Sequence, residues 1–158
     1  MPIDPSTFRS VLGRFASGVT VATVRAPDGT DHGMTVSAFC SLSLQPPLVL
    51  MCIAHDAAMH AVLDGASHFA INILAAGQEA VARRFAEHLD DRFDGIGYER
   101  GATGAAILRG VLAFLECRLT ERHTAGDHTI VIGEVIAAEA SADRPLLYYR
   151  GGYAQLER

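Results

Sequence analysis

The 158-residue sequence contains no lysine and no tryptophan. All thirteen basic residues are arginines. A Walker A lysine and a Schiff-base lysine are therefore both absent, which excludes P-loop nucleotide hydrolases and pyridoxal-phosphate enzymes. Any anion that binds must be held by arginine, by backbone N–H groups or by hydroxyls.

Cysteine is scarce, and several familiar motifs are missing. Cys40, Cys52 and Cys117 are odd in number and form no C-x-x-C pair, which disfavours a disulfide framework and a structural zinc site. The seven histidines form no H-E-x-x-H motif, so no metal site is predicted. No G-x-S-x-G motif supplies a hydrolase serine, and in GIGYER Arg100 replaces the third glycine of a dinucleotide-binding fingerprint.

Charge and hydropathy indicate which kinds of partner and which location to expect. The formal net charge is -5 and the arginines are scattered, which argues against a nucleic-acid binder. No run approaches the ~20 apolar residues of a membrane span. The N-terminal MPIDPSTFRS lacks the features of a signal peptide, so the cytoplasm is the expected location. We expect one domain over residues 1–158.

The periodicity of apolar residues predicts strands with a few inserted helices. We expect helices at 4–17, 57–63 and 78–88, with Gly18 ending the first. Strands are expected at 19–26, 35–43, 48–54, 68–74, 107–121, 128–139 and 145–156, the last bent at Gly151-Gly152. Residues 48–54 are apolar throughout, which predicts burial on both faces, and 89–106 is expected to be an exposed loop.

Consecutive strands in the C-terminal half are expected to be joined by hairpins, with residues 122–127 forming one connection. A doubly wound sheet would need strands and helices in strict alternation, which this half does not provide. The predicted fold class is therefore mainly β with helical insertions, built as an antiparallel closed sheet.

The stretch TVSAFCSLSLQPP (35–47) alternates small hydroxyl side chains with apolar ones. A period of two predicts a strand with one apolar face and one face of small polar groups. A strand that faces water usually carries Lys, Glu or Gln as well, and residues 35–43 carry none. The polar face is therefore a candidate ligand surface.

Two further segments carry candidate functional groups. In GDHTIVIGEV, Gly126 and Asp127 are turn residues and His128 opens a strand at the rim of the sheet, where an imidazole can meet a ligand or lie exposed in an ordinary hairpin. In RRFAEH, two guanidiniums lie beside Phe85 on a helix, as a surface charge pair or as a two-pronged binding group for phosphate.

Seven segments together resemble the short-chain flavin reductases, the reductase components of two-component flavin-dependent monooxygenases. They are HGMTVSAFCSLSLQPPLVLMCI, FAINIL, RRFA, RFDGI, LAFLEC, GDHTIVIGEV and PLLYYRGGY, in an order and at spacings that match that family over about residues 8–156. The resemblance implies an FMN-binding split β-barrel that acts on FMN or FAD.

The resemblance also implies site residues. Thr35, Val36, Ser37, Ala38 and Ser41 would lie along the isoalloxazine and ribityl groups, since short hydroxyls offer partners without filling the space of the ring. His128 would position the nicotinamide. The other implied nucleotide-binding residues are Cys52, His55, Arg84, Phe85, Gly126 and Asp127. The family segment after residue 54 often holds the flavin phosphate through Ser or Thr; here it is HDAAMH, which has no hydroxyl.

The function implied is transfer of hydride from NADH or NADPH to FMN or FAD, with the reduced flavin supplied to a partner oxygenase. A homodimer whose partner chain helps to enclose the flavin is also implied. The alternative is a non-catalytic flavin- or haem-binding split barrel that acts as a store or sensor. Consumption of NADH in the presence of added flavin separates the two.

Overall fold

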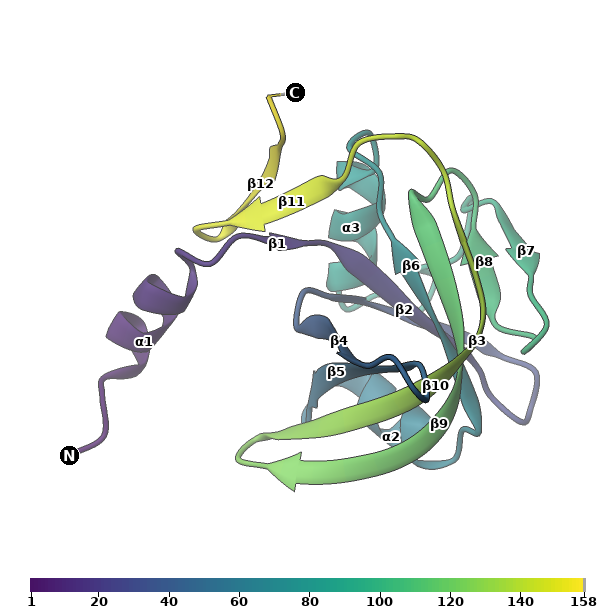
Figure 1. Cartoon of the computed structure of the whole chain (residues 1–158), viewed down its shortest axis with the longest axis horizontal. Coiled ribbons are helices and arrows are strands. Elements are labelled where there is room, and N and C mark those ends of the chain that lie inside the picture. The colour runs from purple at the N-terminus through teal and green to yellow at the C-terminus, as the bar shows by residue number, and fades with distance from the viewer. Residues whose placement is uncertain (158) are drawn as a thin grey trace.

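The computed structural model describes residues 1–157 (Figure 1). The helices are α1 (Pro5–Leu12), α2 (Ala58–Asp64) and α3 (Glu79–Ala86). The strands are β1 (Ser17–Gly18), β2 (Thr20–Arg25), β3 (Asp31–Val36), β4 (Phe39–Ser43), β5 (Leu48–Ala54), β6 (His68–Ile73), β7 (Tyr98–Arg100), β8 (Ala106–Leu108), β9 (Ala113–Ala125), β10 (His128–Ala140), β11 (Leu146–Tyr149) and β12 (Gly152–Gln155).

The main sheet has the strand order β3-β2-β6-β9-β10-β5-β4, and its neighbouring strands pair antiparallel. Its two outermost strands are consecutive in the chain: β3 ends at Val36 and β4 begins at Phe39. Because only two residues connect the opposite edges, the sheet must curl until those edges meet. This is a split barrel, and it confirms the predicted mainly β, antiparallel class with helical insertions.

Two smaller sheets flank the barrel. The β11–β12 hairpin pairs with β1 beside α3, and β7 pairs with β8 at the opposite side (Figure 1). Buried Asn72 joins β8 to the barrel, because it donates to Val21 O at 3.0 Å and accepts from Leu108 N at 2.9 Å.

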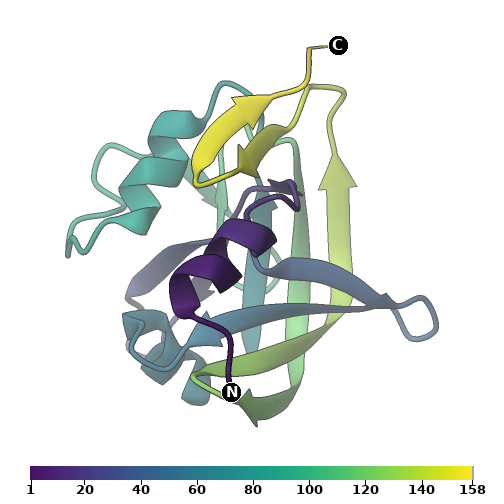
Figure 2. The same ribbon diagram turned by 90° about the vertical axis from the view of Figure 1, so that its left-hand side faces the viewer.

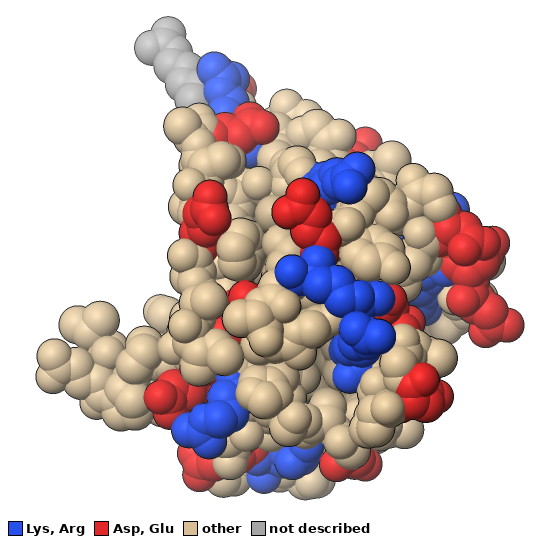
Figure 3. Space-filling model, turned by 90° about the vertical axis from the view of Figure 1, so that its right-hand side faces the viewer, with Lys and Arg blue, Asp and Glu red and all other residues tan. Residues whose placement is uncertain are grey.

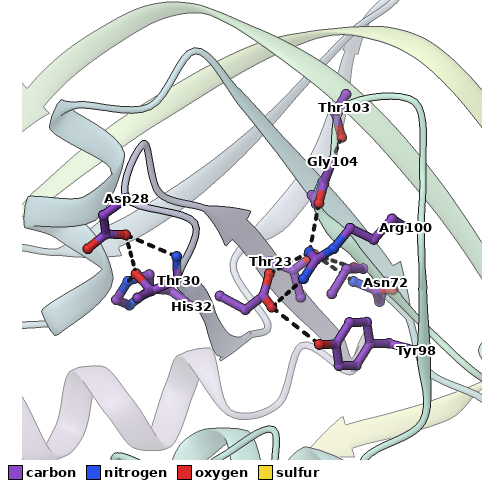
Figure 4. Close-up of polar contacts among 12 residues, drawn as sticks. Thr23, Asp28, Thr30, His32, Asn72, Tyr98, Arg100, Thr103 and Gly104 are labelled. Atoms are coloured by element: carbon purple, nitrogen blue, oxygen red, sulfur yellow. Dashed lines mark hydrogen bonds and ion pairs between the residues drawn. The ribbon is translucent and has the colours of Figure 1, made fainter.

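Paired polar contacts fix the β2–β3 turn and the β7–β8 sheet (Figure 4). Arg100 makes two hydrogen bonds to the Asp31 carboxylate, at 2.7 and 2.8 Å, and a third to Gly104 O. The Thr30 hydroxyl lies between Asp28 and His32. Around these elements the surface mixes acidic and basic groups, as the face in Figure 3 shows.

The predicted single strand over 35–43 is wrong, because the chain changes sheet edge at residues 37–38. The Phe39 N–H donates to Ser37 O at 2.9 Å, which makes a tight turn and ends the alternation that began in β3. Phe39 then packs against the core, whereas Cys40, Leu42 and Leu44 are exposed. Beyond Val36, the expected apolar face of this stretch therefore does not face the core.

Other boundaries also differ from the sequence prediction. Helix α1 ends at Gly13 rather than Gly18, and its N-cap, Asp4, accepts hydrogen bonds from two backbone N–H groups. Residues 109–112 interrupt the strand expected over 107–121, and the expected loop 89–106 contains β7. In the C-terminal segment, Arg150 and Gly151 adopt positive φ, so the expected bent strand is the β11–β12 hairpin.

Part of the apolar surface of the protein is not covered by other elements of the same chain. Strand β5 buries Val49, Met51 and Ile53, but its alternate residues are only half-buried, so the expected burial on both faces is not observed. Helix α1 projects from the barrel and has no buried residue (Figures 1 and 2). Its exposed apolar side chains are Phe8, Val11 and Leu12, and Phe15 follows it.

Candidate functional site

Residues Ser37 and Ala38, which cross between the barrel edges, lie exposed against strand β5. The Cys52 N–H donates to Ala38 O at 3.0 Å. Residues Cys52 and Ala54 are half-buried on the outer face of β5, whereas Ile53 between them is in the core. The edge crossing and the outer face of β5 therefore form one continuous surface.

The turn that carries His128 lies on the same surface. Strand β10 pairs with β5 so that His128 is opposite Ala54, two residues beyond Cys52. Since a strand rises ~3.4 Å per residue, the edge crossing and His128 are offset by ~7 Å along β5. The structure thus brings together predicted site residues 37, 38, 52 and 128, which are far apart in sequence.

His128 is anchored but accessible. Its side chain is 45% exposed, and Nδ1 is 2.7 Å from Asp127 Oδ1. The hydrogen bond with His128 lowers the pKa of the Asp127 carboxyl. Gly126 has a φ of 60°, which suits glycine in this two-residue hairpin connection. The connection between β9 and β10 consists of residues 126–127 rather than the predicted 122–127, because β9 continues to Ala125.

Thr35 lies at a second part of the site, next to α3. Its Oγ1 donates to Ala82 O at 2.7 Å, so the hydroxyl proton is used within the chain. A hollow of about 190 Å³ opens here, lined by Val19, Thr35, Ser37, Ala86, Tyr148 and Tyr153. The rings of Tyr148 and Tyr153 lie 5.4 Å apart, edge to face.

Several residues predicted to touch a ligand do not present their side chains. Val36 and Phe85 are buried in the core, and Phe85 packs edge-to-face on Phe93 at 5.0 Å. The guanidinium of Arg84 donates to two loop carbonyls, Asp91 O and Arg92 O, both at 2.7 Å. None of these three residues lines the hollow, and the guanidinium of Arg84 is not free to bind a phosphate with both of its ends.

The hydroxyls of residues 35–43 do not share one face. Ser41 lies on β4, on the opposite barrel edge from Thr35, and is paired with Val49. The change of edge at residues 37–38 separates the two, a break that a period-two pattern does not reveal. Ser37 is the hydroxyl that lies both at the crossing and in the hollow.

His55 follows β5 and is tied to the His128 turn, because its N–H donates to Asp127 O at 2.9 Å. Its Nε2 lies 3.1 Å from the hydroxyl of Thr129, and Nε2 of His60 lies 2.9 Å from the same hydroxyl. Sequence reasoning missed Thr129, His60 and the two tyrosines. The only signal for the tyrosines was their position around a glycine-rich turn.

Cys52 and Cys117 do not supply a reactive thiolate. Burial, with a smaller effect from Cys40, raises the pKa of the Cys52 thiol. Burial also raises the pKa of Cys117 to about 12. Both thiols are therefore protonated at neutral pH, and all three cysteines are free.

A larger hollow, of about 660 Å³, lies between α2, the β2–β3 turn and residues 88–93. It contains no residue of the predicted site.

Among residues 1–157, no group of three or more His, Cys, Asp or Glu side chains is placed to hold a metal ion. No helix in that range is long and apolar enough to cross a membrane.

The groups around the smaller hollow fit a planar ring with polar edges. Its lining combines the hydroxyls of Thr35 and Ser37 with apolar and aromatic walls, and it contains no charged side chain. Its volume is below the ~300–1,000 Å³ of a complete ligand pocket. The hollow in one chain is therefore smaller than a typical complete ligand pocket.

Comparison with known proteins agrees with this geometry. The model of the flavin reductase like domain matches residues 12–157. An NADH flavin reductase from Kitasatospora aureofaciens is 42% identical over 97% of this chain and 82% of its own. The reductase subunit HsaB of a flavin-dependent monooxygenase from Rhodococcus jostii is 40% identical over 98% of this chain and 80% of its own.

A solved structure shows the same likeness. The NADH:FAD oxidoreductase SgcE6 from Streptomyces globisporus, in complex with NAD and FAD fragments, superposes with a TM-score of 0.92 at 41% identity, covering 99% of this chain and 96% of that one. Sequence match and structural similarity converge: the chain belongs to the flavin reductase-like family.

Proposed function

We propose that this protein is an NAD(P)H:flavin oxidoreductase that uses NADH or NADPH to reduce FMN or FAD. The observation that carries the proposal is the single surface on which the 37–38 crossing and His128 lie ~7 Å apart along β5. That spacing suits two stacked ring systems held from opposite ends. When bound, the flavin supplies the hydride acceptor and the nicotinamide supplies the hydride.

The chain itself contributes binding and alignment. Ser37 and the backbone of Ala38 would contact the flavin edge, and Thr35, Val36, Arg84 and Phe85 would hold the hollow in shape. His128, oriented by Asp127 at 2.7 Å, would position the nicotinamide side. Alignment of two reactants in one site converts an encounter in solution into a step between neighbouring groups.

We infer that the functional unit is a homodimer. Three observations support this: the incomplete hollow of about 190 Å³, the uncovered helix α1, and the exposed Leu42 and Leu44 on the β4–β5 hairpin. The hairpin projects from the body in Figure 2. A symmetric partner could cover these apolar groups and add a second wall to each site.

The receiver of reduced flavin in this proposal is a separate flavin-dependent oxygenase. Support comes from relatives named as reductase subunits of monooxygenases, and from the flavin reductase component of a bacterial two-component tryptophan halogenase, which is 40% identical.

Free thiols at Cys40, Cys52 and Cys117 suit a reducing compartment such as the cytoplasm.

Anaerobic stopped-flow mixing tests the activity. The protein is mixed with FMN or FAD and then with NADH or NADPH, and nicotinamide and flavin absorbance are recorded together. Equal loss of reduced nicotinamide and oxidised flavin supports the proposal. Flavin binding without nicotinamide oxidation by either nucleotide would instead indicate a non-catalytic store or sensor.

A further inference from the structure

Three arginines line a hollow between the end of α1 and the β11–β12 turn, which lie side by side in Figures 1 and 2. The hollow has a volume of about 310 Å³, and its lining residues are Arg9, Ser10, Gly13, Arg14, Arg150 and Gly151. No acidic side chain is among them. Positive charge is therefore concentrated at this place in a chain whose formal net charge is -5.

The guanidiniums of this hollow have no partner among residues 1–157. Arg9, Arg14 and Arg150 are all exposed, and their side chains form no hydrogen bond or ion pair within that range. Three other arginines, by contrast, pair with carboxylates: Arg83, Arg100 and Arg118. Like charges that line one hollow repel one another unless an anion lies between them.

Capping of helix α1 does not account for these arginines. Basic side chains near a helix C-terminus often bind the last carbonyl groups of the helix. Here those carbonyls accept backbone N–H groups instead, at 2.8 to 3.1 Å; they belong to Arg9, Val11, Leu12 and Gly13. The guanidiniums are therefore available to a group from solution.

The β11–β12 turn holds Arg150 in an unfavourable backbone conformation. Its φ is 53°, and the two-residue hairpin turns that need positive φ favour Asn-Gly rather than Arg-Gly. The N–H of Arg150 donates to Gly13 O at 2.8 Å, which fixes the turn against the end of α1. Because an arginine does not favour this turn, its presence points to a role for the guanidinium.

The hollow does not coincide with the apolar side of α1. With 3.6 residues per turn, Phe8, Val11 and Leu12 share one side of the helix, and Arg9 and Ser10 lie outside it. A second copy that covered the apolar side in the proposed dimer would therefore not need to cover the hollow.

A phosphate group matches three guanidiniums better than a single carboxylate does. A phosphate monoester has three terminal oxygens and a charge of about -1.5 to -2 at pH 7, whereas a carboxylate has two oxygens and one charge. Each guanidinium can donate two parallel hydrogen bonds to such oxygens. The chain contains no lysine, so arginine is the side chain that must hold such a group.

We propose that Arg9, Arg14 and Arg150 form a binding site for the phosphoryl group of a small molecule. The bound group would bridge α1 and the β11–β12 turn. The site shares no residue with the hollow beside Thr35 or with the surface that carries His128. It therefore does not depend on the proposed reductase activity.

Isothermal titration calorimetry of the full chain with pyrophosphate, ADP and citrate tests the proposal, in phosphate-free buffer with and without saturating FMN. Arg14→Gln and Arg150→Asn each remove one guanidinium, and asparagine tolerates the positive φ of the turn. Arg150→Lys keeps a cation at that position. Arg144→Asn is the matched control, because Arg144 is exposed and lies outside the hollow. Thermal unfolding checks that each variant is folded.

We expect one pyrophosphate to bind per chain, and Arg14→Gln and Arg150→Asn each to weaken it by ~10-fold through loss of charge-assisted hydrogen bonds. Arg150→Lys should bind pyrophosphate more tightly than Arg150→Asn, and Arg144→Asn should bind it like the parent. Tighter binding of ADP than of pyrophosphate would identify a nucleotide as the source of the phosphoryl group. Equal binding would show that the phosphoryl groups alone are recognised.

Four results would overturn the proposal: no binding of pyrophosphate, equal weakening by Arg144→Asn, tighter binding of citrate than of pyrophosphate, or displacement of pyrophosphate by FMN. The last would assign the anion to the flavin site. A chain that binds pyrophosphate as expected but does not reduce flavin would defeat the proposed function and leave this site established.

Discussion

The backbone N–H of His55 donates a hydrogen bond to the carbonyl oxygen of Asp127 across 2.9 Å. This bond joins the segment after β5 to the hairpin turn that carries His128. The two bonded residues are 72 positions apart in the sequence. The candidate flavin side and the candidate nicotinamide side of the site are therefore fixed relative to each other by the main chain.

His128→Ala is expected to impair use of the nicotinamide nucleotide more than flavin binding. The imidazole lies at the rim, and its loss leaves the 37–38 crossing and its bond to Cys52 intact. Loss of a polar contact of ~1–3 kcal/mol corresponds to about a 5- to 150-fold fall in kcat/KM for the nucleotide. Steady-state kinetics measure this value, and flavin titration measures the flavin Kd.

His123→Ala on the neighbouring strand is the control for the His128 variant, because His123 is exposed and more distant from β5. It should leave both quantities unchanged. Weakened flavin affinity in His128→Ala, with an unchanged kcat/KM for the nucleotide, would reverse the assignment.

Much of the barrel could be predicted from the sequence. Strong apolar runs such as 48–54 and 68–74 set their strands, because such runs have few alternatives to burial. The division of residues 35–43 between strands β3 and β4 could not be predicted. Alternation describes which residues can share a face only while the strand continues, and the turn at Ser37 is made by a backbone bond that leaves no trace in residue type.

Only part of the candidate site could be predicted, for a similar reason. Ser37, Ala38 and His128 match family motifs and lie on one surface. Thr129, by contrast, has an ordinary strand sequence around it. The two histidines that contact its hydroxyl are brought there by α2 and by the end of β5. Burial of Phe85 likewise depends on Phe93 in a loop that sequence composition presented as exposed.

Glu116→Ala is expected to destabilise the protein through loss of a loop anchor. The Glu116 carboxylate is buried and accepts from the N–H groups of Ala102 and Thr103 and from the Thr103 hydroxyl. Loss of these part-buried hydrogen bonds to a buried carboxylate is expected to cost ~1–3 kcal/mol in all. Urea unfolding should show a lower midpoint at constant slope. Exposed Glu121→Ala should unfold like the parent; an equal loss in both variants would contradict the anchor role.

Acid stability is expected to depend on the Asp31–Arg100 pair. The hydrogen bond from Arg100 holds the pKa of the Asp31 carboxyl below its ordinary value of 3.8, despite partial burial. Between the two pKa values the unfolded chain binds more protons than the folded one, so the contribution is full above about pH 4 and is lost as pH falls through the folded pKa. Asp31→Asn should reduce stability at pH 6 and flatten its fall between pH 4 and 2.

Thermal unfolding of the parent and of Asp31→Asn across that range measures the effect. Asp64→Asn, at the exposed end of α2, serves as the control. A parallel pH dependence for Asp31→Asn and the parent would show that this pair does not contribute to acid stability.

The double substitution Phe8→Ser and Leu12→Ser is expected to weaken the proposed dimer without unfolding the chain. No residue of α1 is buried, and Phe8 and Leu12 are 53% and 52% exposed, so their loss removes little packing within one chain. An obligate interface of this type should bury ~2,000 Å² or more, and apolar side chains at its centre carry much of the binding energy. Light scattering on dilute protein should show the mass falling toward one chain of 16.8 kDa.

Flavin affinity should fall together with the mass, because the hollow beside Thr35 and Ser37 has only part of its wall in one chain. Arg9→Ser/Ser10→Ala, on the same exposed helix, should change neither property. If the parent chain is a stable monomer with full flavin reductase activity, one chain builds the complete site. The exposed apolar face of α1 would then require another partner.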